Sequence, residues 1–117
     1  KPEDFAVSKL EEAELRKILQ FALWDLESLV TWDRNEVEAA LMELAKRMAL
    51  KVRDCLAPLF VAVTGQAVSL SVIDSISVLG LDLTRARIRG AIEVLGGISK
   101  KQAKSLEKEY AALLPSA

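Results

Sequence analysis

The stretch P-L-F-V-A-V-T-G, Pro58 to Gly65, decides whether this chain is purely helical or contains a strand. Its apolar run with alternating β-branched residues is typical of a buried strand, whereas a proline before it and a glycine after it are typical of a short helix. A strand has to pair, and no second segment has a convincing strand pattern. We therefore interpret the stretch as a short buried helix, with Pro58 in its first turn and Gly65 at its end.

Two longer helices are predicted before this stretch. Ser8 and Glu11 fit the two ends of a capping box, and the apolar residues after them recur in steps of three and four to about Val30. A second box, formed by Asp33 and Glu36, starts another apolar stripe of the same period. The predicted inward positions are Leu15, Ile18, Leu19, Ala22, Leu26 and Leu29 in the first helix, then Val37, Ala40, Leu41, Leu44 and Met48 in the second.

Two shorter helices are predicted after the opening stretch. Ser69 fits the N-cap of the first, and we expect Gly80 to end it in the left-handed conformation. Thr84 fits the N-cap of the second, which is followed by Gly96-Gly97. The predicted inward positions are Val72, Ile73, Ile76 and Leu79, then Ile88, Ala91, Ile92 and Leu95.

The last helix is predicted to follow a third capping box, Ser99-Lys100-Lys101-Gln102, and to stop before Pro115. Its inward positions are Ala103, Leu106, Tyr110 and Leu113. Together with the helical interpretation of the opening stretch, the chain has about six helices. We therefore predict an all-α fold, a single compact bundle over residues 1–117.

The composition limits the classes of function. The chain has 117 residues, of which 51% are apolar and 28% charged, enough for one core and its surface. One cysteine and no histidine argue against an internal disulfide, a zinc site and an activated thiol. No apolar run is long enough to cross a bilayer and no signal peptide is recognisable, so we expect a cytoplasmic location without a membrane partner. No acid–base pair stands out, and we expect no catalytic or metal-binding residue.

The charge is unevenly distributed along the chain. The net charge of −1 is unusual for a free-standing nucleic-acid-binding protein. Residues 1–57 carry nine basic and twelve acidic groups, whereas residues 58–117 carry seven and five. Between residues 84 and 104, six basic residues are accompanied by Glu93 alone. The net charge therefore hides a basic segment in the C-terminal half of the chain.

The opening stretch also resembles a known family. P-L-x-V-A-V-T-G, followed by Ser69 and then by Leu79-Gly80, is similar to the C-terminal anticodon-binding domain of bacterial glutamyl-tRNA synthetase. Arg87-Ile88 resembles an arginine–aliphatic pair in that family's next helix, and Thr31-Trp32-Asp33 resembles the tryptophan at the start of the preceding one.

The resemblance covers roughly residues 15–95 and implies an all-α anticodon-binding domain that is a C-terminal fragment of a longer chain. It implies a role for a glutamate–tRNA ligase: holding the anticodon arm of tRNA-Glu, with tRNA-Gln left open as a second ligand. It implies an upstream catalytic domain that binds ATP with magnesium. The present chain lacks the class I signatures, so we expect it to be no enzyme by itself and to hold no cofactor.

A surface that holds an anticodon loop needs cations for the phosphates and places where splayed bases stack. The candidate tRNA-binding residues are Phe60, Ser69, Val72, Arg85, Arg87, Arg89, Lys100 and Lys101. Among them Arg87 matches a family position, while Arg85 and Arg89 share the other flank of the same helix. Solvated charges, a helix cap at Ser69 and a core aromatic at Phe60 are the plain structural alternatives.

The chain departs from the family pattern where that pattern is cationic. Phe60 replaces an arginine, Asp54 stands near the place of a common lysine, and Leu81 replaces a lysine. Fewer cations mean weaker and less salt-sensitive binding of phosphate groups. The alternative hypothesis is therefore a diverged helical domain that has lost tRNA binding and contacts a protein partner, through an apolar patch of Leu70, Leu81 and Leu83.

Overall fold

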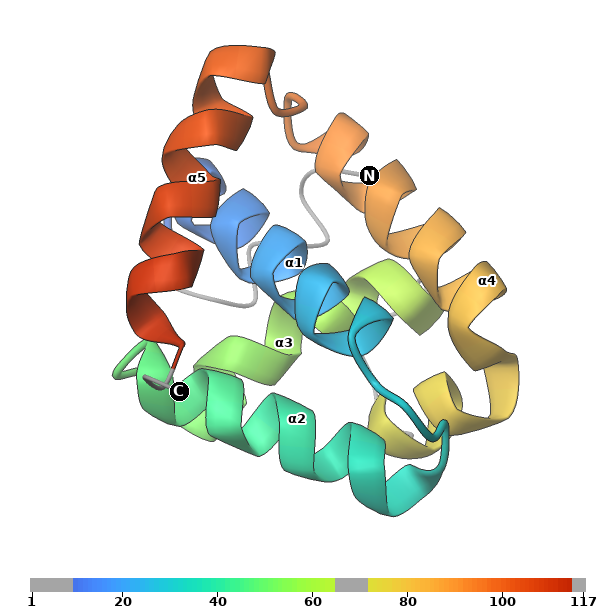
Figure 1. The fold of residues 1–117 in the computed structure, drawn as a ribbon. Helices are drawn as coiled ribbons and strands as arrows, with labels where there is room; N and C mark the ends of the chain where they lie inside the picture. The colour runs from blue at the N-terminus through green and yellow to red at the C-terminus, as the bar shows by residue number, and fades with distance from the viewer. Residues whose placement is uncertain (1–9, 65–71, 115–117) are drawn as a thin grey trace.

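The computed structural model describes residues 10–64 and 72–114, which form five α-helices (Figure 1). They are α1 (Glu12–Glu27), α2 (Arg34–Arg47), α3 (Val52–Thr64), α4 (Val72–Val94) and α5 (Lys100–Leu113). The described residues contain no strand, so the all-α prediction is confirmed and the opening stretch is helical up to Thr64. The predicted number of about six helices is one too high, because two predicted helices form the single element α4.

Helix α1 lies at the centre of the molecule, packed against α2, α3 and α4, while α4 and α5 diverge on either side of it (Figure 1). The period of three and four placed much of the core correctly in α1, α2 and α4, while the predicted inward residues Leu29, Ala40, Met48 and Leu79 are half-buried. The predicted positions that are buried are Leu15, Ile18, Leu19, Ala22, Leu26, Val37, Leu41, Leu44, Val72, Ile73, Ile76, Ile88, Ala91, Ile92 and Leu95. Within residues 10–64 and 72–114, no helix combines the length and apolarity needed to span a bilayer.

Helix α3 begins earlier than we predicted from the position of Pro58. It starts at Val52, where the amide of Cys55 donates to the carbonyl of Lys51 over 3.1 Å, so Pro58 stands inside the helix and not in its first turn. A proline inside a helix removes one backbone hydrogen bond and crowds the preceding turn. Here the buried side chains of Cys55 and Leu59 lie one turn apart on either side of it and favour the continuous helix.

Helix α4 joins the two helices predicted around Gly80. Gly80 has φ 83° and ψ 172°, so the chain turns there and resumes its helix. The expected positive φ is confirmed, but the ψ angle is extended and not left-handed helical, a combination that essentially only glycine adopts. The predicted N-cap at Thr84 is wrong: its side chain is fully buried inside α4, and its hydroxyl has no hydrogen-bond partner among the described residues.

The other predicted caps differ in outcome. The carboxylate of Asp33 accepts from the amide of Glu36 over 2.8 Å, and both bonds of the Ser99–Gln102 capping box are present. The first helix, however, begins after Glu11, which makes no side-chain cap bond. Ser8, Gly65 and Ser69, which were predicted as helix-end residues, lie outside the described residues.

Two helices end with the pair of backbone bonds that closes a Schellman motif. At the end of α4, the amide of Gly97 donates to the carbonyl of Ile92 over 2.8 Å and that of Gly96 donates to Glu93 over 3.1 Å. At the end of α2, the amide of Leu50 donates to Ala45 over 2.9 Å, and Ala49 takes φ 57°. Ala49 thus occupies a left-handed position that glycine would occupy with less strain.

Candidate nucleic-acid interface

Arg87 connects helix α4 to the end of the stretch that opened the analysis. Its Nη1 donates a hydrogen bond to the backbone carbonyl of Val63, in the last turn of α3. The last four carbonyls of a helix lack partners within it, and a cation there also interacts favourably with the helix dipole. The structure therefore brings together the arginine and the P-L-F-V-A-V-T-G motif, which the resemblance had linked only through sequence.

The same contact leaves most of the Arg87 guanidinium available. A guanidinium has five N–H donors, and one hydrogen bond is formed within the described part of the chain. The residue is exposed, and no carboxylate of the described residues pairs with it. Arg87 is thus held in place at its backbone contact while its charge faces solvent, an arrangement that suits binding of an anionic group.

Arg85 and Arg89 face the opposite flank of α4, towards the C-terminal end of α1. The Nε of Arg85 lies 2.8 Å from Oε2 of Glu27, and its Nη1 lies 3.2 Å from Oδ1 of Asp82. Arg89 Nη2 is 4.0 Å from the same Glu27 oxygen, and its side chain is 63% exposed. The charge of Arg85 is therefore largely neutralised within the domain, whereas Arg89 projects into solvent.

The candidate residues nearer the core are differently placed. Phe60 is half-buried and packs against the core, so part of its ring is covered by the protein. Val72 is buried with 5% exposure at the start of α4, and its side chain belongs to the core. Ser69 lies outside the described residues. Of the apolar patch proposed for a protein partner, Leu81 is half-buried and Leu83 is 41% exposed, while Leu70 lies outside the described residues.

Lys100 and Lys101 lie on a different helix from the arginines. They are exposed in the first turn of α5, across the Gly96–Gly97 turn from the end of α4 (Figure 1). No carboxylate of the described residues pairs with either lysine. The candidate cations therefore form two groups, one on α4 and one on α5.

Helix α5 is attached to the bundle by a polar network that the sequence analysis missed. The Tyr110 hydroxyl donates to Asp25 of α1, and Arg47 Nη2 of α2 lies 3.1 Å from the other oxygen of the same carboxylate. Asp25 is 7% exposed, and its burial raises the pKa of the carboxyl against the opposing effects of Tyr110 and Arg47. Burial also raises the pKa of the Tyr110 hydroxyl, and the Asp25 carboxylate raises it further. A visible signal existed: Asp25 follows Ala22 by three residues, on the apolar face of its helix.

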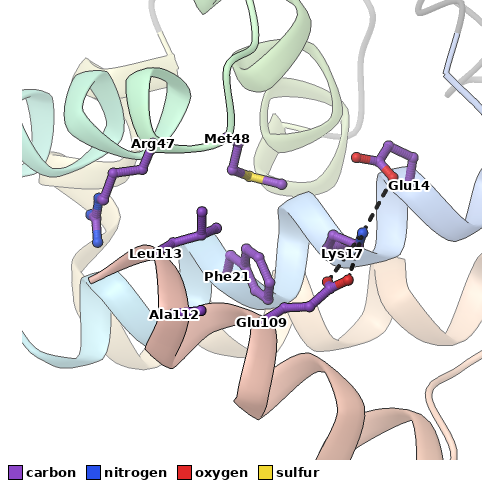
Figure 2. A pocket seen from close by; sticks show the side chains of 8 residues that line it. All are labelled: Glu14, Lys17, Phe21, Arg47, Met48, Glu109, Ala112 and Leu113. Atoms are coloured by element: carbon purple, nitrogen blue, oxygen red, sulfur yellow. Dashed lines mark hydrogen bonds and ion pairs between the residues drawn. The ribbon is translucent and has the colours of Figure 1, made fainter. Parts of the chain in front are cut away.

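Near this polar network, two clefts lined by described residues lie along α5. One, of about 340 Å³, is lined by both charged and apolar side chains: in Figure 2, Lys17 reaches between Glu14 and Glu109, and Phe21 lies near Leu113. Lys17 Nζ lies 3.1 Å from Glu109 and 3.6 Å from Glu14. The other cleft, of about 200 Å³, lies between α1 and the first half of α5. Helix α5 therefore rests on the bundle without filling the space beneath it.

The remaining titratable groups do not form a reactive site among the described residues. Burial, reinforced by the charge of Asp25, raises the pKa of the Cys55 thiol to about 12, so the thiol stays protonated at neutral pH. No group of three or more cysteine or carboxylate side chains in the described ranges is arranged to hold a metal ion.

Comparison with known proteins identifies relatives that match almost the whole chain. A family model described as an anticodon binding domain matches residues 1–92, and its match ends within α4. A glutamate–tRNA ligase of Marinobacter nauticus is 52% identical over 113 residues, which are 97% of this chain and 23% of the relative. Glutamate–tRNA ligases of a Marinomonas species and of Saccharophagus degradans are 54% and 51% identical over 111 residues, 95% of this chain and 22% of each relative. The chain thus spans less than a quarter of the length of these relatives.

Proposed function

The chain belongs to the anticodon-binding-domain family, and from this premise we propose that it holds the anticodon arm of tRNA-Glu for a glutamate–tRNA ligase. The observation that carries the proposal is the identity of more than half of the aligned residues to glutamate–tRNA ligases over almost the whole chain. In the proposal, a catalytic domain in the same longer protein binds ATP with magnesium and performs the aminoacylation. The complete enzyme works in the cytoplasm, where its tRNA is.

The geometry supports an RNA-binding surface centred on Arg87. A cation held at the end of α3, with most of its donors directed to solvent, suits a phosphate group of the anticodon loop. Arg89 adds a second exposed cation on the same helix. Phe60, in the neighbouring helix α3, is half-buried, and the proposal includes stacking of its ring on a splayed base.

The proposal assigns Arg85 a positioning role. Its bonds to Glu27 and Asp82 tie α4 to the end of α1 and orient the helix that carries Arg87 and Arg89. A contact with RNA through Val72 would have to use its backbone, because its side chain is buried.

The test is the affinity of the chain for an anticodon-arm hairpin of tRNA-Glu, measured by fluorescence anisotropy at low salt. Arg87→Gln removes the charge and keeps a polar side chain, and we expect it to weaken binding about tenfold, as loss of one charge-assisted hydrogen bond does. Arg87→Glu should weaken binding further. Arg53→Gln, which removes an exposed cation at the start of α3, is the matched control and should retain the affinity.

Hairpins with altered anticodon bases, including that of tRNA-Gln, measure which loops are accepted. Undiminished affinity of both Arg87 variants would remove Arg87 from the site. A parent chain that binds no hairpin at low salt would favour the alternative function as a protein-interaction domain, to which the neutralised Arg85 and the exposed Leu83 give some support.

A further inference from the structure

Helix α5 has one face composed of lysines, and building on the proposed function we propose that this face is a second RNA-binding surface. The lysine stripe consists of Lys100, Lys101, Lys104 and Lys108. We propose that it binds the phosphate backbone of the base-paired stem that adjoins the anticodon loop, without reading base identity.

The lysines share one side of the helix. With 3.6 residues per turn, successive residues are rotated by about 100°, which places the four lysines within a sector of about 100°. The side chains that contact the bundle or line the cleft beneath α5, Tyr110, Glu109 and Leu113, lie on the opposite side. All four lysines are exposed, so the stripe faces away from the bundle.

The stripe has more positive than negative charge: beside its four lysines, Glu107 is exposed at the edge of the same sector. Among the described residues no carboxylate pairs with any of the four lysines, and Glu109 of the same helix is paired with Lys17 of α1. Lys100 and Lys104, and likewise Lys104 and Lys108, are four residues apart, a spacing at which like charges repel.

The position of these lysines along α5 is unfavourable as well. The first turn of α5 contains no acidic residue, although the N-terminal end of a helix favours negative charge. Lys100 and Lys101 occupy that turn. The repulsion between neighbouring lysines and the cations in the first turn both destabilise α5 in the free protein. An anion bound along the stripe relieves both effects.

The chemistry of the side chains indicates backbone contacts. Lysine is a compact, mobile point charge that neutralises phosphate without the planar fork by which arginine recognises a base edge. From Lys100 to Lys108 the stripe is about 12 Å long, at about 1.5 Å per residue, and one strand of a duplex carries about three phosphates over that length. The arginines of α4 and the lysines of α5 are thus suited to different parts of one hairpin, its loop and its stem.

The stripe is also held in a defined orientation. The Ser99–Gln102 capping box closes the start of α5, and the bond from Tyr110 to Asp25 fixes its second half on α1. The four lysines are therefore presented on a supported helix and not on a free tail.

The experiment compares two triple variants of the 117-residue chain that lose the same charge. The stripe variant is Lys100→Gln, Lys104→Gln and Lys108→Gln. The control variant is Lys46→Gln, Lys51→Gln and Arg53→Gln, which removes three exposed cations near the end of α2 and the start of α3. Binding to the tRNA-Glu anticodon-arm hairpin and to hairpins with altered loops is measured over a range of salt concentrations, with circular dichroism as a check on folding.

We expect the stripe variant to bind every hairpin more weakly by one common factor of at least tenfold at low salt. The slope of log affinity against log salt concentration should fall by about two, because about 0.7–0.9 of a unit is lost with each phosphate contact. The control variant should keep the parent's slope, and all three chains should be equally helical.

The outcomes separate this proposal from the function on which it rests. An unchanged slope in the stripe variant, with the parent still sensitive to the anticodon, overturns the stripe and leaves the proposed function standing. Three other outcomes also overturn the stripe proposal. These are an equal loss of affinity in the control variant, a loss of affinity for one loop sequence alone, and binding of polyglutamate by the stripe in place of RNA. A reduced slope in a chain insensitive to the anticodon supports the stripe and contradicts the proposed function. A parent that binds no hairpin overturns both.

Discussion

Helices α4 and α5 are consecutive in the chain and are both amphipathic, yet they are held by different forces. Seven residues of α4 are buried, and the helix packs against α1, α2 and α3. No residue of α5 is buried, and the helix is held by Tyr110, by the ion pair of Lys17 with Glu109, and by half-buried apolar side chains. The comparison indicates that α4 is part of the core that sets stability, whereas α5 is free to carry a charge pattern that stability alone would disfavour.

The test with the largest expected effect replaces one side chain in each region by alanine. Ile88 of α4 is fully buried, and Ile88→Ala should lower the free energy of unfolding by about 2–5 kcal/mol. Leu106→Ala in α5 removes a half-buried side chain and should cost less than about 1.5 kcal/mol, because little contact with the core is lost. Urea unfolding followed by circular dichroism measures both. Equal losses would show that α5 is as much a part of the core as α4.

The second test removes only the polar attachment of α5. Tyr110→Phe keeps the ring, whose centroid lies 5.4 Å from that of Phe21 and 5.2 Å from that of Trp24, but deletes the hydroxyl bonded to Asp25. Leaving the buried carboxylate one donor short should cost about 1–3 kcal/mol. Hydrogen exchange should accelerate in the amides of α5 while those of α4 keep their protection. A uniform acceleration across both helices would contradict the separate attachment of α5.

The third test concerns the bend within α4. Gly80 and Gly90 both have open space where a Cβ would stand, but only Gly80 has a positive φ. Gly80→Ala should therefore destabilise by about 1–3 kcal/mol through backbone strain. Gly90→Ala, in an ordinary helical position, should stabilise by about 1 kcal/mol. Thermal unfolding decides between them, and a neutral Gly80→Ala variant would mean that the bend is not needed.

Alkaline pH is expected to loosen α5 before the bundle. The pKa of Tyr110 is raised in the folded protein above the unfolded value of about 10. The stabilisation that the Tyr110 hydroxyl contributes is fully present below its pKa in the unfolded protein. It is lost as the pH rises above about 10 towards its pKa in the folded protein. Trp24 fluorescence should report the loss, because its ring packs against that of Tyr110 with an interplanar angle of 53°. Tyr110→Phe is the control: it keeps Cys55, whose pKa is also raised, and should lack the tyrosine-dependent part of the change.

The smallest expected effect is an increase in the stability of the protein. Ala49 has φ 57° at the end of α2, and Ala49→Gly should relieve strain and stabilise the bundle by about 0.5–1 kcal/mol. The melting temperature should rise slightly, with hydrogen exchange in α5 unchanged. A lower melting temperature would indicate that the entropy of the added glycine in the unfolded chain outweighs the relief.

The local part of the fold was predictable from the sequence. The side chains of Asp33 and Ser99 cap their helices as expected, and Gly80 takes a positive φ. Each of these features depends on bonds within one or two turns, which a short sequence pattern describes in full. The start of α3 was missed because Pro58 is a helix-start signal locally, whereas the burial of Cys55 and Leu59 depends on the neighbouring helices.

The candidate site divides in the same way. Sequence singled out Arg87 through its resemblance to a family position, and it placed Arg85 and Arg89 on one flank. It could not show that Glu27 neutralises Arg85, because the two residues are 58 positions apart in the chain. Nor could it show that the Val72 side chain is covered.

By itself, the sequence determined that the protein is helical, much of the core of α1, α2 and α4, and the helix starts capped by Asp33 and Ser99, since apolar period and capping are interactions between near neighbours. Only the tertiary structure decided that Arg87 meets the end of α3, that Asp25 joins three helices, and that α5 lies outside the core with its lysines turned to solvent. Those arrangements pair residues from distant parts of the chain, and their energies depend on burial and distance, which exist only after the helices have packed.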